Sequence, residues 1–203
     1  MTTLLQLRRM VRNRLGSPPS DSFFSDDKVD DAINNAIATL ESERNWPWQE
    51  RMTTLTTGDD TGSIPLPADW RSTRSVWAER ELDFLPTYEL ERWYTTGGTP
   101  TVFSHLNGNL ELRPKPATGT TVKLYYDRNP TLLFEDADEP DLPSTAYPAI
   151  VAKAAQLCST REDDRPSANT HLLEYSQWVD RLYNITVQSK RPAGRRIRPG
   201  GWI

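Results

Sequence analysis

The chain has 203 residues, of which 36% are hydrophobic and 26% are charged, and its formal net charge is −4. This composition predicts a globular protein able to bury one large core or two small lobes. No apolar run reaches the roughly eighteen residues of a membrane span, and arginines interrupt the apolar pattern at the N-terminus, so we expect neither a membrane span nor a signal peptide.

Two amphipathic helices are predicted at the start of the chain. The first covers residues 3 to 15, where apolar residues recur at helical spacing and arginines lie off the apolar stripe. The stripe consists of Leu4, Leu7, Val11 and Leu15, and the arginines are Arg8, Arg9, Arg12 and Arg14. The second helix follows Ser25, whose side chain is expected to cap it, and ends near Asn45. Its apolar face consists of Val29, Ala32, Ile33, Ala36, Ile37 and Leu40.

A β-rich region is predicted over residues 50–130, because short alternating segments are separated there by turn residues. In VFSHLNGNLEL (102–112), Asn107-Gly108 lies between two alternating runs. Asn-Gly at this place favours a type I′ hairpin, since both central residues need a positive φ. A further strand is predicted at TVKLYYD (121–127), and a short helix at PTYELERWY (86–94).

Two more helices are predicted after an acidic loop, FEDADEPDLP (134–143). Ser144 or Thr145 is expected to cap the first of them. Its apolar stripe consists of Ile150, Val151, Ala154, Leu157 and Cys158. A long helix follows, with Leu172, Tyr175, Trp178, Val179, Leu182 and Ile185 on one side. The single cysteine is predicted to be a buried thiol, which favours a reducing cytoplasm or a particle assembled in one.

The order of these elements predicts an α+β fold, in which the terminal helices pack together as a helical bundle and an antiparallel β region projects as an insertion. We expect a single domain over residues 1–189, helical over 1–46 and 143–189 and β-rich over 50–130. Residues 190–203 are predicted to form an extended C-terminal arm.

Sequence patterns typical of catalysis or metal binding are absent. His105 and His171 lie in different elements, with no HxxxH pattern or nearby cysteine to form a zinc site. The chain has no phosphate-binding loop or nucleophile elbow, and the acidic loop lacks the spacing and glycine of a calcium loop. Three tryptophans, Trp70, Trp77 and Trp93, favour a core or a subunit interface, with a platform for a sugar or base as the alternative. We therefore expect no enzymatic activity, no cofactor and no metal.

The C-terminal segment KRPAGRRIRPGGWI (190–203) has five cations and no acidic residue, and its two prolines and three glycines exclude a regular helix. Because this segment carries +5, residues 1–189 carry −9. Such a tail is suited to nucleic acid or to an acidic surface of a partner, including a second copy of the chain. The acidic loop of a neighbouring copy is one such surface. The apolar tip, Trp202 and Ile203, indicates a binding segment rather than a solubilising one.

The order of five segments resembles the head-to-tail connector adaptors of tailed double-stranded DNA bacteriophages. These segments are DDAINNAIATLESERNWPW (30–48), IPLPADW (64–70), LELRPKP (110–116), LYYDRNPTLLFEDADEPDLP (124–143) and YPAIVAKAAQL (147–157). The similarity extends over most of residues 3 to 187. It implies a virion structural protein at the head–tail junction, assembled in the host cytoplasm as a homo-oligomeric ring, typically of twelve copies, through which the genome DNA passes.

The resemblance also implies partners for particular residues. The portal protein would receive the C-terminal arm, through Arg191, Arg195, Arg196, Arg198, Trp202 and Ile203. A tail, nozzle or tail-tube protein would bind the β region. The concentration of cations on the first helix predicts that it contacts an acidic surface of an adjacent copy or of the portal, through Arg8, Arg9, Arg12 and Arg14. The acidic loop, through Glu135, Asp136, Asp138 and Glu139, is expected to contact the first helix or the tail of a neighbouring copy. The arm is expected to be disordered in the free monomer and ordered in the particle.

Two alternatives stay open at this point. One is a neighbouring virion role, as a stopper or tail-completion protein. The other is a nucleic-acid-binding protein that uses the basic arm, although the acidic body would repel DNA and carries no recognisable recognition helix. An enzyme, such as a carbohydrate-active tail component, lacks a catalytic constellation in this sequence.

Overall fold

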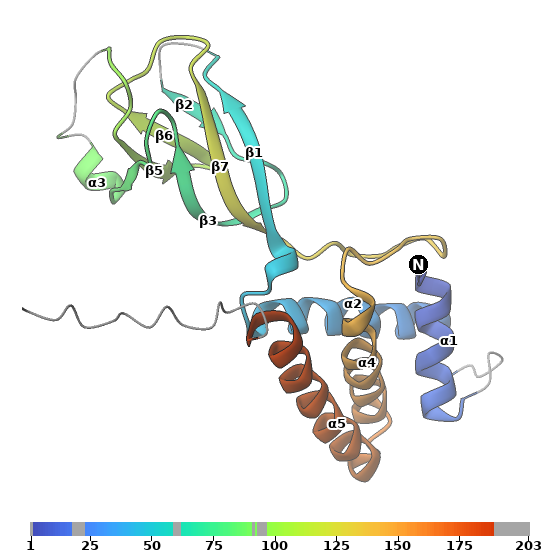
Figure 1. Ribbon diagram of the computed structural model, residues 1–203. Coiled ribbons are helices and arrows are strands. Elements are labelled where there is room, and N and C mark those ends of the chain that lie inside the picture. The colour runs from blue at the N-terminus through green and yellow to red at the C-terminus, as the bar shows by residue number, and fades with distance from the viewer. Residues whose placement is uncertain (1, 18–22, 59–61, 91, 93–96, 189–203) are drawn as a thin grey trace, which may run out of the picture. The chain divides into compact units, whose positions relative to one another are not determined.

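The structure, a computed structural model, describes residues 2–17, 23–58, 62–90, 92 and 97–188. It divides into a helical unit, Met1–Trp48 with Pro130–Ile203, and a β unit, Gln49–Asn129. Along the sequence, the described helices of the helical unit come before and after the strands of the β unit (Figure 1). The predicted α+β fold is therefore confirmed, while the C-terminal segment lies outside the described residues.

Within the described residues, the helical unit has four long helices: α1 (Leu4–Leu15), α2 (Asp26–Glu43), α4 (Tyr147–Arg161) and α5 (Arg165–Tyr183). The last of these continues as a π-helical turn (Asn184–Gln188), and two short 3-10 turns lie at Pro47–Gln49 and Ser144–Ala146. Helix α4 packs against each of the other three helices (Figure 1). A helix surrounded by neighbours needs apolar side chains on several of its sides, and these side chains must be small enough for the other helices to approach closely. The alanines of α4 meet both requirements. The buried alanines are Ala149, Ala152, Ala154 and Ala155.

One apolar core joins these helices, and the predicted stripes of α1 and α2 provide much of it. Leu4, Leu7 and Val11 of α1 are fully buried, as is the predicted face of α2 almost throughout. Trp46 is also fully buried, and its indole donates a hydrogen bond to the carbonyl of Leu40 at 2.7 Å. Cys158 is buried as predicted.

The helix ends differ from the predictions. Helix α2 begins after Ser25, but the Ser25 side chain accepts no capping hydrogen bond from a backbone amide of the helix. Helix α4 begins at Tyr147 rather than after a capping Ser144 or Thr145, because Pro148 occupies its first turn and those two residues form the preceding 3-10 turn. The predicted face of α5 is only partly correct, since Leu172 and Ile185 are 42% and 49% exposed.

The β unit contains two sheets. Strands β1 (Glu50–Thr56), β7 (Thr121–Arg128) and β3 (Trp70–Trp77) form an antiparallel sheet with β7 in the middle. Strands β2 (Ser63–Pro65), β6 (Asn109–Arg113), β5 (Val102–Leu106) and β4 (Asp83–Phe84) form the second, antiparallel except for the short β4–β5 pair. A short helix, α3 (Thr87–Leu90), lies within the segment predicted to be helical, of which residues 91, 93 and 94 lie outside the described residues.

Both sheets contribute to a second apolar core. Its buried residues include Val76 of β3, Leu110 and Leu112 of β6, and Val122 and Leu124 of β7. The predicted hairpin connects β5 and β6 through Asn107 and Gly108, whose φ angles of 51° and 78° are those that a type I′ turn requires. The Asn-Gly signal therefore located the turn correctly.

Candidate assembly surfaces

Arg8 and Arg12 of α1 are buried within the helical unit. The Arg8 guanidinium donates two hydrogen bonds to Asp30, at 2.8 and 2.6 Å, and its Nη2 lies 3.0 Å from Asp136. Arg12 donates to the Asp26 carboxylate at 2.7 Å and to the carbonyl of Phe24. The hydrogen bonds that Arg8 donates to Asp30 raise the pKa of Arg8 above its ordinary value. These two arginines therefore connect α1 with the start of α2 and with the acidic loop inside one chain.

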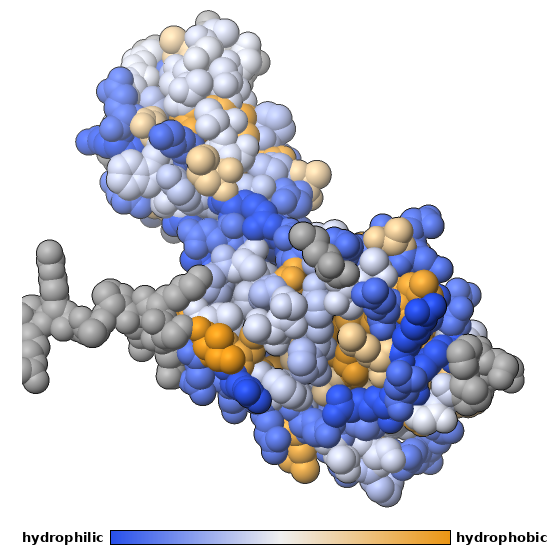
Figure 2. Space-filling model, turned by 45° about the vertical axis from the view of Figure 1, so that its right-hand side comes forward, coloured by the Kyte–Doolittle hydropathy of each residue, from blue (hydrophilic) through white to orange (hydrophobic). Residues whose placement is uncertain are grey.

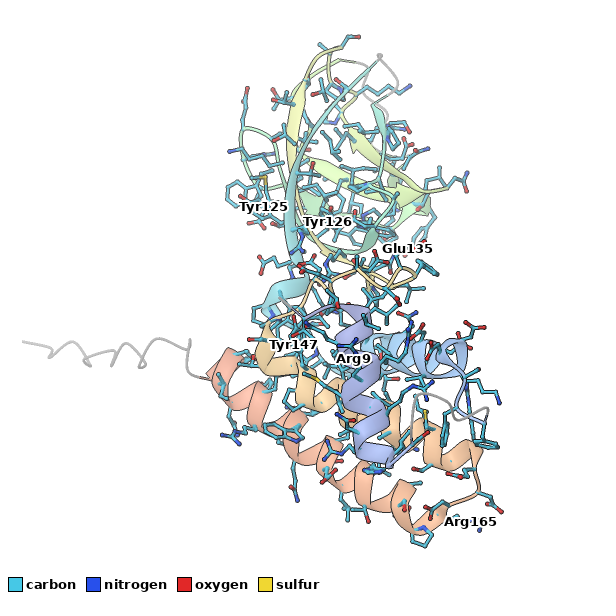
Figure 3. The ribbon with its side chains drawn as sticks, turned by 90° about the vertical axis from the view of Figure 1, so that its right-hand side faces the viewer. Arg9, Tyr125, Tyr126, Glu135, Tyr147 and Arg165 are labelled. Carbon is cyan, nitrogen blue, oxygen red and sulfur yellow. The ribbon has the colours of Figure 1, made fainter. Side chains whose placement is uncertain are left out.

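The other two arginines of α1 have different surroundings. Arg14 forms an ion pair with Glu174 of α5. Arg9 is exposed, and within the residues that the structure describes it has no ion pair. Figure 3 shows Arg9 on α1 and Glu135 on the acidic loop. Of the four arginines expected at a subunit contact, Arg9 is the one whose charge faces solvent.

The acidic loop is held in place although it has no regular secondary structure. The backbone amides of Leu4 and Leu5 donate to the carbonyls of Asp138 and Asp136, at 2.8 and 3.2 Å. Asn34 of α2 exchanges two hydrogen bonds of 2.9 Å with the backbone of Leu133. The loop is thus fixed by the first turn of α1 and by the middle of α2.

The four acidic residues expected at a subunit contact fall into two groups. The Asp138 carboxylate accepts from the amides of Phe134 and Glu135, at 2.7 and 2.9 Å, and these backbone hydrogen bonds lower the pKa of Asp138. Asp136 pairs with Arg8. Glu135 and Glu139 are exposed. Two of the four carboxylates therefore serve the fold of the loop, and two face outward.

An open cleft of about 760 Å³, here called the loop cleft, lies beside the acidic loop. It is lined by Thr2, Trp48, Glu139, Pro140, Asp141, Leu142, Pro143, Ser144 and Tyr147. Figure 3 shows Tyr147 at the first turn of α4, at the end of the helical unit where α1 begins. Burial raises the pKa of Tyr147, whose hydroxyl is hydrogen bonded to the backbone of Thr2. The cleft was not predicted from the sequence, because residues from distant segments form it.

Exposed apolar side chains are scattered over both units. In the helical unit they include Phe134, Leu173 and Ile185, and in the β unit Phe84 and Tyr88, which are 57% and 74% exposed. On the face of the helical unit in Figure 2, apolar groups form separate patches among strongly hydrophilic ones. Sequence periodicity did not identify these residues, since it predicts which side chains are buried and not which apolar ones stay exposed.

The tryptophans of the β unit partly follow the prediction. Trp70 is partly buried against the β core, whereas Trp77 is 41% exposed and Trp93 lies outside the described residues. The arm residues Arg191, Arg195, Arg196, Arg198, Trp202 and Ile203 also lie outside them.

The surroundings of the titratable groups do not resemble a catalytic centre. His105 packs among Trp70, Phe84 and Phe103 and shares a hydrogen bond of 2.9 Å with Thr73, while His171 lies 3.5 Å from Glu174. Burial raises the pKa of the Cys158 thiol to about 11, which keeps it protonated and unreactive.

Among the described residues, no three His, Cys, Asp or Glu side chains gather as a metal site would require. None of the described helices combines the length and apolar character needed to cross a membrane.

Comparison with known proteins identifies the family. A search of curated proteins finds no match. The family model of the SU10 adaptor protein matches residues 2–199, which include the helical unit, the β unit and most of the basic C-terminal segment. The chain therefore belongs to the SU10 adaptor protein family, whose members are structural adaptors of bacteriophages and not enzymes.

Proposed function

We propose that this protein is a head-to-tail connector, which forms a ring between the portal protein and the tail and lets the genome DNA pass through. The family match over residues 2–199 carries this proposal, because it covers both units together and not a single shared motif. The net charge of −9 over residues 1–189 supports it, since an acidic ring repels DNA and so favours passage over binding. A ring of twelve copies is the expected size.

The C-terminal segment is proposed to attach the ring to the portal. Arg191, Arg195, Arg196 and Arg198 would steer it to an acidic surface, and Trp202 and Ile203 would anchor it.

Copies would meet through the exposed charges Arg9, Glu135 and Glu139, while Arg8, Arg12, Asp136 and Asp138 hold each copy in shape. The β unit would receive the next tail component.

Particle assembly with an altered chain tests the proposal. Deletion of Gly201, Trp202 and Ile203 is expected to leave a folded protein that fails to join the portal, giving DNA-filled heads without tails. Replacement of the five cations of 190–203 by glutamine should slow attachment in a salt-dependent way and weaken it less than the deletion. Native mass measurement of the protein mixed with portal would count the copies.

Two results would redirect the assignment. A truncated chain that occupies portals normally but has lost affinity for DNA would identify the segment as a nucleic-acid arm. A protein that joins particles only after another connector component is in place would instead be a stopper or a tail-completion protein.

A further inference from the structure

The loop cleft has the chemistry of a peptide-binding groove. Trp48 and Tyr147 are half-buried in it, and the Trp48 ring is stacked on Trp46 with 4.7 Å between ring centroids, which holds it in place. Two exposed carboxylates, Glu139 and Asp141, lie on the same cleft. Its remaining apolar lining is Pro140, Leu142 and Pro143. Grooves with aromatic walls bind extended, proline-containing segments, and nearby carboxylates select cationic ones.

The chain itself contains a segment of the matching chemistry. RPAGRRIRP (191–199) has four arginines, two prolines and no acidic residue. Proline favours the extended polyproline conformation, and arginine both pairs with carboxylates and stacks on aromatic rings. The helical unit already contains such stacking, since Arg44 lies 4.5 Å from the Tyr183 ring centroid and Arg181 lies 5.1 Å from that of Trp178.

We propose that the loop cleft of one copy binds residues 191–199 of a neighbouring copy. This inference rests on the proposed ring and names one of its contacts. The chain after Gln188 has fifteen residues, with an extended reach of about 50 Å, which is enough to cross to a neighbour. Donor segment and acceptor cleft are different surfaces, and a contact of this heterologous kind repeats around a ring until it closes. Gly200 and Gly201 then separate the bound segment from its tip, which stays available to the portal.

Binding of a fluorescein-labelled synthetic peptide of residues 190–203 to the full-length chain tests this contact. Fluorescence anisotropy at low ionic strength is expected to show saturable binding that weakens with added salt. The double variant Glu139→Gln with Asp141→Asn should bind about tenfold more weakly, as two exposed ion pairs are lost. The matched control, Glu162→Gln with Asp31→Asn, also removes two exposed carboxylates but lies outside the cleft and should bind like the wild type.

A further variant distinguishes a neighbour's segment from the chain's own. At concentrations at which light scattering shows the wild type to be a monomer, the full-length chain with the five cations of 190–203 changed to glutamine keeps its cleft and is expected to bind the peptide within about threefold of the wild type. If it binds more than tenfold tighter, the segment occupies its own cleft at a high effective concentration, and the proposal is wrong. Absent binding, or equal binding to the cleft variant and its control, would also overturn it. Because this titration contains no portal protein, a negative result would reject the contact between segment and cleft and would leave the proposed connector function to the particle-assembly test.

Discussion

Arg8 has the largest set of charge contacts described in the helical unit. Its guanidinium contacts the carboxylates of Asp26, Asp30 and Asp136, and only 10% of its side chain is exposed. Without the cation, three carboxylates from two segments, α2 and the acidic loop, would lie close together with their mutual repulsion uncompensated. Arg8 therefore holds α1, α2 and the acidic loop together.

Substitution of Arg8 by glutamine is expected to lower the free energy of unfolding by about 3 kcal/mol, because it leaves partly buried carboxylates without their cation. The neighbouring exposed Arg9, changed to glutamine, should alter it by less than about 0.5 kcal/mol. Urea unfolding of both variants measures the difference. Equal and small effects would show that Arg8 serves an interface rather than the single chain.

His105 predicts a pH dependence for the β unit. Burial lowers its pKa in the folded protein, so the unfolded chain binds the proton more readily. The neutral His105 side chain therefore makes its full contribution to the free energy of unfolding above the pKa of the unfolded chain, about 6.5. This contribution is lost as the pH falls below that value.

The thermal unfolding midpoint of the wild type should accordingly fall further than that of the variant His105→Gln between about pH 7.5 and about pH 5. His171→Gln serves as the control, since His171 lies on α5 of the helical unit and does not belong to the β unit. The control should keep the wild-type slope. An identical slope in the His105 variant would contradict the prediction.

At the scale of the elements, turns and loops are fixed by different means. The β5–β6 hairpin is specified locally, since Asn107 and Gly108 adopt the positive φ angles that their residue types favour. The acidic loop is specified by distant groups, the first amides of α1 and the side chain of Asn34. A local change should therefore perturb the hairpin in a predictable way.

Gly108→Ala is expected to destabilise the protein by about 1 kcal/mol, because Gly108 has a φ of 78° and alanine disfavours that region. Gly58→Ala is the matched control. A Cβ at either position meets open space, but the φ of Gly58 lies outside the positive range, so the control should be neutral or slightly stabilising. Chemical denaturation compares the two. Similar losses in both variants would show that φ at Gly108 is not the cause.

At the scale of the whole molecule, the stability of each unit comes from its own core. The helical core gathers α1, α2, α4 and α5, and the β core gathers residues from both sheets. In the acidic loop, the Asp138 carboxylate accepts hydrogen bonds from two backbone amides of the turn, and the Asp136 carboxylate forms an ion pair with Arg8. This arrangement supports a fold that holds without a metal ion.

Dialysis of the purified protein against a chelator should therefore leave its unfolding midpoint unchanged within about 1 °C. Elemental analysis should find less than one metal ion per chain. A stoichiometric metal that survives chelation, or a midpoint that drops on its removal, would contradict this expectation.

Several local features of this protein can be predicted from short stretches of its sequence. Helical periodicity placed the buried faces of α1 and α2, the Asn-Gly pair placed the hairpin, and the order of segments indicated the adaptor family. These features depend on residues that are close together in the sequence, whose conformational preferences do not require contacts with distant segments. Only the tertiary structure decided the roles of the charges, because Arg8 and Asp136 meet across most of the chain length, and Thr2, Trp48 and Tyr147 line one cleft. Whether a charged side chain is buried or paired depends on which distant segment of the chain packs against it. The spacing of residues along the sequence does not show which distant segments lie close together in space.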